Sequence, residues 1–411
     1  MGWVAASGAA LFGAALALAL TAGKAAARSR ALLVGASAYT GNDGITDLNG
    51  PRNDVTMMWR YLKSIGYADE DIVVLSDGLP QTADFPALKG AATYGAIVDE
   101  LDALAAASYS AGDLVVFYYA GHGTTVPDLD PGEELLPEAD GRDQVILPVD
   151  VRERLPDGSI ENAIVDDELG RRLDAIRARG VDVWAVIDAC HSGGGARGGE
   201  VARYVDPAVL GITDALPPQA VSRGGPAPAT FATAASEPGK GRLAAFFAVD
   251  AFNLAYEKKF DFADYQLPLA GETEDQRKLG VFSNYLHRAL VSGRAKTFGE
   301  LFQVVVAGIA ADPVNASNPR PVAEGQLDMA LPGSDGGRGM LRAVLDRGVL
   351  RIPAGVFDGF EEDAGVAIYD PEDPSRQLAT GRIASATAAN SVVRRLRWID
   401  AETAAQGWTE P

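Results

Sequence analysis

The chain has 411 residues, of which 47% are apolar and 22% are charged, and these proportions exclude an intrinsically disordered protein. Its 56 acidic residues outnumber its 36 basic ones. The resulting net charge of −20 argues against nucleic acid or an anionic membrane as a partner, because phosphate binding needs clustered Lys and Arg. A single cysteine excludes an intramolecular disulfide.

An apolar run, ALFGAALALALTAG, occupies residues 10–23 and has the length of a signal-peptide core. It is short for a membrane span, which needs about 20 apolar residues. No Lys or Arg precedes it, and a buried Ala-rich helix and an uncleaved anchor are the alternatives. We predict a signal peptide over residues 1–27. The mature protein is then exported to the periplasm or outside the cell, and is not bound to a membrane.

Strand-like and helix-like patterns alternate after this segment. Continuous apolar runs predict strands that are buried on both faces, at 30–37, 71–77, 113–123, 181–189 and 243–249. Apolar residues at helical spacing predict helices within 49–67, 94–108, 165–178, 280–293 and 297–310. This alternation predicts an α/β fold with a mostly parallel sheet that is covered by helices on both faces.

The composition changes twice along the chain. Residues 206–242 are rich in Pro, Gly, Ala and Ser, which predicts a surface linker. Beyond Pro332, short apolar runs separated by Gly, Pro, Asp and Asn predict a small all-β C-terminal module. The predicted organisation after the signal peptide is a main domain over 28–310, with a large part (28–205), the linker (206–242) and a small part (243–310), then a second linker over 311–332 and the module over 333–411.

Two of the predicted strands end on reactive side chains. FYYAGHG brings His122 to the end of one strand, and VIDACHSGG brings Cys190 to the end of another. In open parallel sheets, active sites gather at the carboxyl ends of the strands. A histidine can deprotonate a thiol, whose ordinary pKa is about 8.5, or hold the thiolate as an ion pair. The sequence therefore predicts Cys190 as a nucleophile and His122 as its base.

The chain has three histidines, and His122 is the best partner among them. His191 directly follows the cysteine, so its side chain points away from Cys190, and His287 lies within a predicted helix. The glycines beside His122 let the backbone approach a peptide closely, and the N–H groups of Gly123 and Cys190 are predicted to face a developing oxyanion. A small buried cysteine is the alternative. Zinc binding is another, but the histidines lack zinc spacing.

The motifs YYAGHG and DACHSGG resemble those of the caspase-like cysteine peptidases, and specifically of their metacaspase branch. The similar segments run from about Arg30 to Ala310 and include ALLVGASAY, LNGPRNDVTMMWRYLKSIGY, DQVILPVD, IVDDEL, LAAFFAVDAFNLAYE and GVFSNYLHRAL. The resemblance implies a caspase-like sheet flanked by helices. It also implies hydrolysis of peptide bonds by a Cys–His dyad through an acyl-enzyme.

Metacaspases cleave polypeptides after arginine or lysine, using an acidic pocket, and the pocket acids of the family fall on Asp54 and Asp188. Two carboxylates near the nucleophile would pair with a cationic side chain. The alternatives are that Asp54 serves the dipole of a helix in its first turn and that Asp188 bonds local backbone. Ala120 stands where the family often has a serine.

The resemblance also raises calcium, because several metacaspases require it. The matching positions are Asp150, Asp166 and Asp167, and a hard cation prefers several oxygen ligands. Arg197 stands where the family has a further acid, and an acidic helix N-terminus is the alternative interpretation of VDDEL. We expect that no cofactor is required, and calcium binding at these three residues stays open.

The leading prediction is thus an exported cysteine endopeptidase of metacaspase type. One alternative is an idle caspase-like scaffold that binds a partner. Another is a peptidase of the same clan with a different specificity, such as the legumain or clostripain type. The linker contains Arg223, Lys240 and Arg242, basic residues at which such an enzyme would cut itself.

Overall fold

The computed structural model describes residues 29–79, 87–129, 141–190, 200–213, 239–250, 253–260, 277–312, 319–332, 344–346, 349–352, 362–369, 377–386 and 391–399. The predicted signal peptide over 1–27 lies outside these ranges, and so do His191, Arg197 and Arg223. Within the described ranges, no helix combines the length and the apolarity that a bilayer crossing requires.

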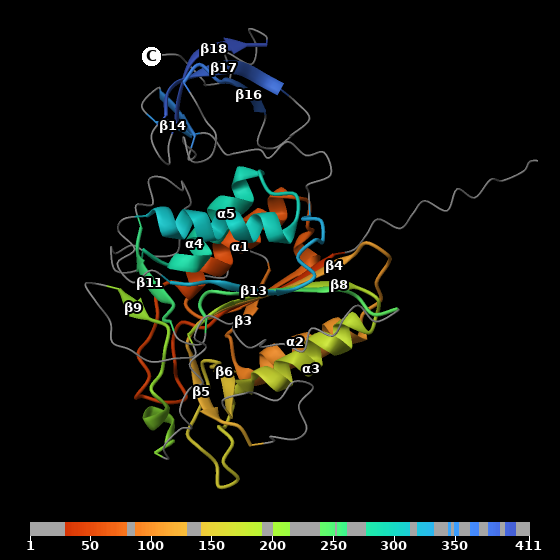
Figure 1. Cartoon of the computed structure of the whole chain (residues 1–411), viewed down its shortest axis with the longest axis vertical. Coiled ribbons are helices and arrows are strands. Elements are labelled where there is room, and N and C mark those ends of the chain that lie inside the picture. Colours follow the sequence, from red (N-terminus) through yellow and green to blue (C-terminus); the bar gives the residue numbers. More distant parts are fainter. Residues whose placement is uncertain are drawn as a thin grey trace, which may run out of the picture.

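A seven-stranded sheet forms the centre of the main domain (Figure 1). Its strands are β1 (Arg30–Gly35), β2 (Ile72–Ser76), β3 (Leu88–Gly90), β4 (Leu114–Ala120), β8 (Asp182–Asp188), β10 (Leu243–Phe247) and β13 (Val322–Gly325). Their order is β13-β10-β8-β4-β1-β2-β3, and every neighbouring pair is parallel except β10 with β13. The prediction of a mostly parallel sheet is confirmed.

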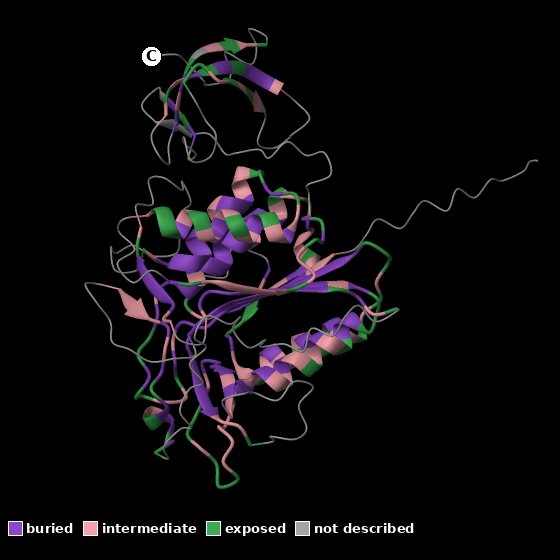
Figure 2. Ribbon diagram, viewed as in Figure 1, coloured by how far each residue is buried: buried purple, intermediate pink, exposed green. Residues whose placement is uncertain are grey.

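Helices cover both faces of this sheet (Figure 1). One layer holds α1 (Pro51–Ser64), α4 (Val281–Ser292) and α5 (Phe298–Ala311), and the other holds α2 (Tyr94–Ala106) and α3 (Asp166–Arg177). Successive residues of a strand face opposite sides, so Leu33 packs in the core under the first layer and Leu32 in the core under the second. Burial on both faces explains why the central strands are continuously apolar (Figure 2).

Two small antiparallel sheets adjoin the central one. The first contains β5 (Gly123–Pro127), β6 (Arg142–Ile146) and β7 (Ile164–Val165), and the second contains β9 (Val201–Ala202), β11 (Tyr256–Lys259) and β12 (Lys278–Gly280). Two 3₁₀ turns complete the domain, η1 (Asp69–Asp71) and η2 (Pro207–Leu210). The single strand predicted over 113–123 is therefore two strands that belong to different sheets, and His122 lies in the break between them.

The prediction of a linker over 311–332 is wrong in its second half. Residues 322–325 form β13, which pairs antiparallel with β10, and Met329 and Leu331 are buried in the core under α5. An uncovered β10 would expose a row of unpaired backbone groups, which β13 satisfies. The main domain therefore extends to about residue 332.

The C-terminal residues form a separate five-stranded antiparallel sheet, as the predicted all-β module requires. Its strands are β14 (Val344–Asp346), β15 (Val349–Ile352), β16 (Gly365–Tyr369), β17 (Gln377–Ala386) and β18 (Ser391–Trp398), in the order β14-β15-β18-β17-β16. Its small core contains Leu350, Ile352, Ile383 and Val393.

Candidate active site

The site lies at the carboxyl ends of β4 and β8, which are neighbours in the sheet. Ala120 and Asp188, their last residues, are paired in register. The order of the strands reverses between β1 and β4, and ligands of open α/β sheets bind beside such a switch point. His122 and Cys190 each follow one of these strand ends by two residues. The topology therefore brings the two predicted catalytic residues together at the carboxyl ends of two neighbouring strands.

Gly123 allows the two strand ends to approach each other. A Cβ atom at this position would collide with the carbonyl oxygen of Cys190 and would lie 3.0 Å from the carbonyl oxygen of Val145. Only glycine fits without displacing backbone. The sequence suggested that this glycine makes room for a substrate, and in the structure it makes room for the backbone that carries the nucleophile.

The imidazole of His122 is buried and held from two sides. Its Nε2 lies 2.8 Å from the carbonyl oxygen of Thr46, and the ring of Tyr39 packs against it with centroids 5.0 Å apart. A carbonyl can only accept, so Nε2 carries the proton and Nδ1 carries the lone pair. Nδ1 has no hydrogen-bond partner among the described residues. Burial lowers the pKa of His122 to about 4, so the ring is neutral at pH 7 and its basic nitrogen is unoccupied.

The thiol of Cys190 is completely buried and faces the chain just before β11. Its Sγ donates to the carbonyl oxygen of Ala255 at 2.9 Å and accepts from the N–H of the same residue at 2.8 Å. Burial raises the pKa of Cys190, so the resting sulfur is a thiol. Within the described part of the chain no hydrogen bond joins Cys190 to His122, and a catalytic pair often closes only when substrate is bound.

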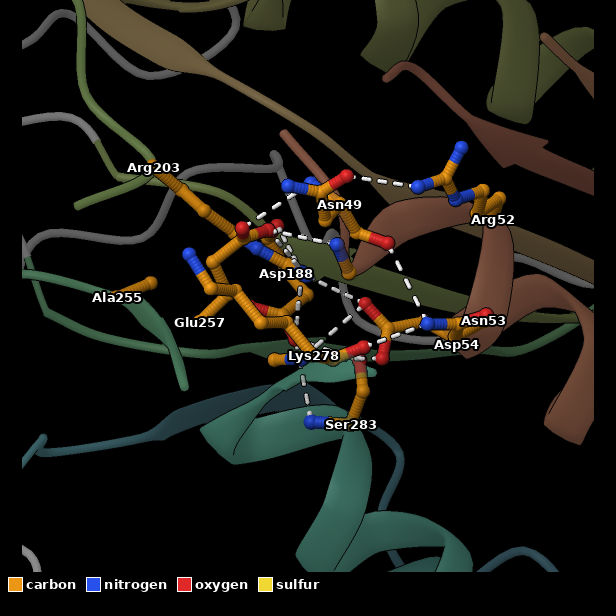
Figure 3. Close-up of polar contacts among 12 residues, drawn as sticks. Asn49, Arg52, Asn53, Asp54, Asp188, Arg203, Ala255, Glu257, Lys278 and Ser283 are labelled. Carbon is orange, nitrogen blue, oxygen red and sulfur yellow. Dashed lines mark hydrogen bonds and ion pairs between the residues drawn. The ribbon is translucent and has the colours of Figure 1, made fainter. Parts of the chain in front are cut away.

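Three carboxylates surround the guanidinium of Arg203 (Figure 3), and the space that they enclose is called the acidic pocket below. Asp54 lies in the first turn of α1, Asp188 ends β8, and Glu257 lies on β11. All three are buried. The sequence predicted Asp54 and Asp188 as pocket acids, and the structure adds Glu257 as a third.

Backbone N–H groups hold each carboxylate in place. Asp54 accepts from Gly280 at 3.1 Å, and Glu257 accepts from Gly50 at 2.8 Å. Asp188 accepts from the N–H of Ser283 at 3.1 Å, in the first turn of α4. The positive end of the α4 dipole favours a negative charge at that point. The two glycines let these amides approach, because a Cβ atom at either would press on the pocket.

The side chain of Arg203 fills this pocket and is itself fully buried (Figure 3). One guanidinium nitrogen lies 3.0 Å from the Asp188 carboxylate, and the other bonds Asp54 and lies 3.9 Å from Glu257. Burial raises the pKa of Asp54 to about 7, although Arg203 opposes the shift. The three carboxylates outweigh burial at Arg203 and raise the pKa of its guanidinium. One cation thus compensates a pocket that is built for positive charge.

The two amides predicted as oxyanion donors converge on one oxygen. The N–H groups of Gly123 and Cys190 each lie 3.1 Å from the carbonyl oxygen of Arg203. Two donors on one acceptor is the arrangement that stabilises a developing oxyanion. The geometry therefore suits the predicted role, which itself stays a prediction.

The three acids proposed for calcium do not come together as ligands. Asp150 accepts from the N–H of Tyr94 at 2.7 Å, at the start of α2, and Asp166 accepts from the N–H of Gln144 at 3.1 Å. Asp167 lies 3.9 Å from Arg171. Among the residues that the structure describes, no group of three or more His, Cys, Asp or Glu side chains could hold a metal. Within the described ranges these three acids therefore form no ligand group, and two of them accept from backbone N–H groups; residues 191–199, which include Arg197, lie outside those ranges.

Two of the three basic linker residues, Lys240 and Arg242, lie near the amino ends of the strands, opposite to the end that carries Cys190. Arg242 pairs with Asp182 at 2.7 Å, at the first residue of β8, whereas Cys190 follows the last. Lys240 pairs with Asp174 of α3 at 2.9 Å. As placed, neither residue reaches the nucleophile.

The segment that carries His122 and Cys190 is similar to a known protein family. Residues 29–196 match the family described as "Metacaspase, peptidase C14 domain". This part of the chain, which is less than half of its length, is similar to the metacaspase family. It is 36% identical over 167 residues to Metacaspase-1 of Emericella nidulans and 37% identical over 167 residues to Metacaspase-1A of Aspergillus fumigatus.

Each of these two alignments covers 40% of this chain. They cover 36% and 35% of the relatives, so the chain spans about a third of the length of the metacaspases that it matches. Among solved structures, a crystal structure of a Geobacter sulfurreducens protein is similar with a TM-score of 0.44 and 20% identity. That alignment covers 72% of this chain and 93% of the other.

The metacaspase match contains Asp54, His122, Asp188 and Cys190 but ends before Arg203 and Glu257. Neither residue was among the predicted site residues. Arg203 lies in VARYV, which carries no quoted motif, and Glu257 ends the segment LAAFFAVDAFNLAYE, which resembled the family but was given no role in the site. Neither stretch was predicted as a strand, and nothing in the sequence indicated that the two residues would meet.

Proposed function

We propose that the protein is a cysteine endopeptidase that cleaves polypeptides after arginine or lysine, with Cys190 as nucleophile and His122 as base. The observation that carries this proposal is an acidic pocket beside Cys190 that already accommodates an arginine side chain. The similarity of residues 29–196 to the metacaspase family supports the peptidase class. An idle scaffold is disfavoured because both members of the dyad are present.

The chemistry follows from the positions of these groups. Nδ1 of His122 takes the proton of the Cys190 thiol, and the thiolate attacks the carbonyl carbon of the substrate. The oxygen of that carbonyl gains charge and accepts from Gly123 and Cys190 N–H. His122 then gives its proton to the departing amine, and water hydrolyses the thioester. Before this can begin, the Cys190 sulfur has to leave Ala255.

The pocket sets the preference for basic residues. A guanidinium presents donors in a planar fork and satisfies two carboxylates at once, while an ammonium does so less completely. An aspartyl side chain would meet repulsion from Asp54, Asp188 and Glu257. We therefore expect cleavage after Arg at or above the rate for Lys, and no cleavage after Asp.

The test is an assay of the purified full chain on arginyl, lysyl, aspartyl and uncharged reporter peptides. We expect hydrolysis of the first two alone, abolished in Cys190→Ala and lowered by about 10²–10⁴-fold in His122→Ala. The His191→Ala variant is the control and should retain activity. Equal hydrolysis of all four reporters, or an active Cys190→Ala protein, would overturn the proposal.

We also propose that the protein is exported after removal of residues 1–27, on the strength of the apolar run at 10–23. N-terminal sequencing of protein recovered from outside the cytoplasm tests this. Recovery of the chain only in the cytoplasm with its first 27 residues intact would contradict it.

A further inference from the structure

A short segment of the chain, residues 201–205, crosses the active site as an added strand. In β9, Ala202 pairs antiparallel with Tyr256 of β11, and the N–H of Arg203 donates to the carbonyl oxygen of Ala255 at 2.9 Å. On the other side, the N–H of Val205 donates to the carbonyl oxygen of Gly123 at 3.0 Å. An extended peptide recognised by strand addition makes bonds of this kind.

The backbone of Arg203 lies where the reacting carbonyl of a substrate would lie. Its oxygen accepts from both Gly123 and Cys190, at 3.1 Å each. These amides are the ones that would stabilise the oxyanion in the proposed reaction. The peptide bond that follows this carbonyl joins Arg203 to Tyr204.

The side chain of Arg203 occupies the specificity pocket, and the fit is close. A Cβ atom at Gly50 would lie 2.6 Å from one of its terminal nitrogens, and a Cβ atom at Gly280 would lie 2.7 Å from the other. Strand direction, carbonyl position and side-chain pocket are three separate observations. Together they describe an arginine bound as a substrate is bound.

We propose that Arg203 is an internal substrate mimic that keeps the enzyme latent, so that residues 201–205 must leave before an external arginine can enter. This inference rests on the proposed function. The mimic is not attacked in this arrangement because the Cys190 sulfur is held by Ala255 and is protonated. A pocket that is open for one part in a hundred of the time binds its ligand about 100-fold more weakly.

The mimic is displaceable because its own bonding is incomplete. Within the described residues, Nε of Arg203 and Oδ1 of Asp188 have no hydrogen-bond partner although both are buried. Leaving buried polar atoms unpaired is unfavourable, which weakens the closed arrangement. A substrate arginine that pairs these atoms more completely can compete for the carboxylates.

The first experiment compares the wild-type chain with Arg203→Ala on the arginyl reporter peptide. We expect kcat/KM to rise at least about tenfold, mainly through a lower KM, because the competing side chain is gone. Arg242→Ala is the matched control, since this arginine also forms an ion pair but at the opposite edge of the sheet. Its kcat/KM should equal that of the wild type.

The second experiment measures binding without turnover, by calorimetry with argininamide. Cys190→Ala should bind it weakly, and Cys190→Ala/Arg203→Ala should bind it at least about tenfold more tightly. Removal of Arg203 leaves three buried carboxylates without their cation, which is destabilising. Argininamide should therefore also raise the melting temperature of the double variant and leave that of Cys190→Ala nearly unchanged.

The outcomes separate this inference from the proposed function. If Arg203→Ala folds and has wild-type kcat/KM, and argininamide binds both Cys190→Ala proteins alike, the mimic is refuted although cleavage after arginine stands. If no protein cleaves any peptide but the double variant gains argininamide binding, the peptidase proposal fails and the occupied pocket stands. If Arg203→Ala does not fold, Arg203→Lys replaces it and should show a smaller rise, whereas no rise would count against the mimic.

Discussion

Asp188 serves the pocket and the fold with one side chain. It faces the Arg203 guanidinium, and it accepts from Ser283 at the start of α4. Asp188→Ala should therefore remove most of the preference for basic substrates, at a loss of about 2–5 kcal/mol when one partner of a buried charge pair is lost. The measurement is the ratio of kcat/KM between arginyl and uncharged reporters.

Asp54→Ala should lower the same ratio, and circular dichroism checks that both variants keep their helices. Ratios at the wild-type value in both variants would contradict the acidic pocket, even with the dyad intact.

His122 makes the stability of the fold depend on pH. Its pKa of about 4 lies below the ordinary 6.5, so the unfolded chain takes up a proton first as the pH falls. The contribution of the neutral, buried imidazole to the unfolding free energy is complete above pH 6.5 and is lost as the pH falls towards 4. Between pH 7 and pH 4.5 the wild type should lose about 2–3 kcal/mol more unfolding free energy than His122→Asn does. Urea unfolding at the two pH values measures this, and parallel losses would refute it.

At the scale of elements, the sequence predicted the central strands and the helices around them to within a few residues. Continuous apolar runs and helical spacing depend on local burial, which the sequence carries directly. The break after β4 was missed because AGHG continues an apolar run, and only the packing of Gly123 against Cys190 shows that a new sheet begins there.

The pocket was predicted only in part, for a different physical reason. Asp54 and Asp188 belong to motifs, but Arg203 and Glu257 take their meaning from partners far away in the chain. The bond between Arg203 and Asp54 joins residues 149 positions apart, and that between Glu257 and Gly50 joins residues 207 apart. No local sequence pattern encodes such a pairing, so it can be seen only once the three-dimensional structure is known.

The junction of β4 with β5 gives a prediction at this scale. Gly123→Ala places a methyl group against the Cys190 carbonyl, so the strand ends must separate and the oxyanion donors must move. We expect the loss of at least about 10²-fold in kcat, as when an oxyanion donor is removed. Gly95→Ala is the control, because a Cβ atom there meets nothing within 4 Å and the residue lies in α2. It should be active and at least as stable as the wild type.

The whole molecule should work without calcium. The acids aligned with the family's calcium ligands contact backbone N–H groups and a basic side chain instead, and form no ligand cluster among the described residues. Activity on the arginyl reporter should be the same in a chelator and in millimolar calcium, and calcium should leave the melting temperature unchanged. Loss of activity in the chelator, restored by calcium alone, would show that a metal assembles this site.

The position of β10 has a consequence for the covalent integrity of the protein. β10 lies between β8 and β13 and is buried, so the small part of the domain shares one sheet with the large part. The chain between residues 213 and 239 connects the two parts covalently, since a chain with one cysteine has no internal disulfide. A protease that nicks this stretch should leave a non-covalent heterodimer, which separates into two bands in denaturing electrophoresis but elutes as one species in gel filtration. Dissociation of the nicked protein without denaturant would mean that the sheet alone does not hold the halves together.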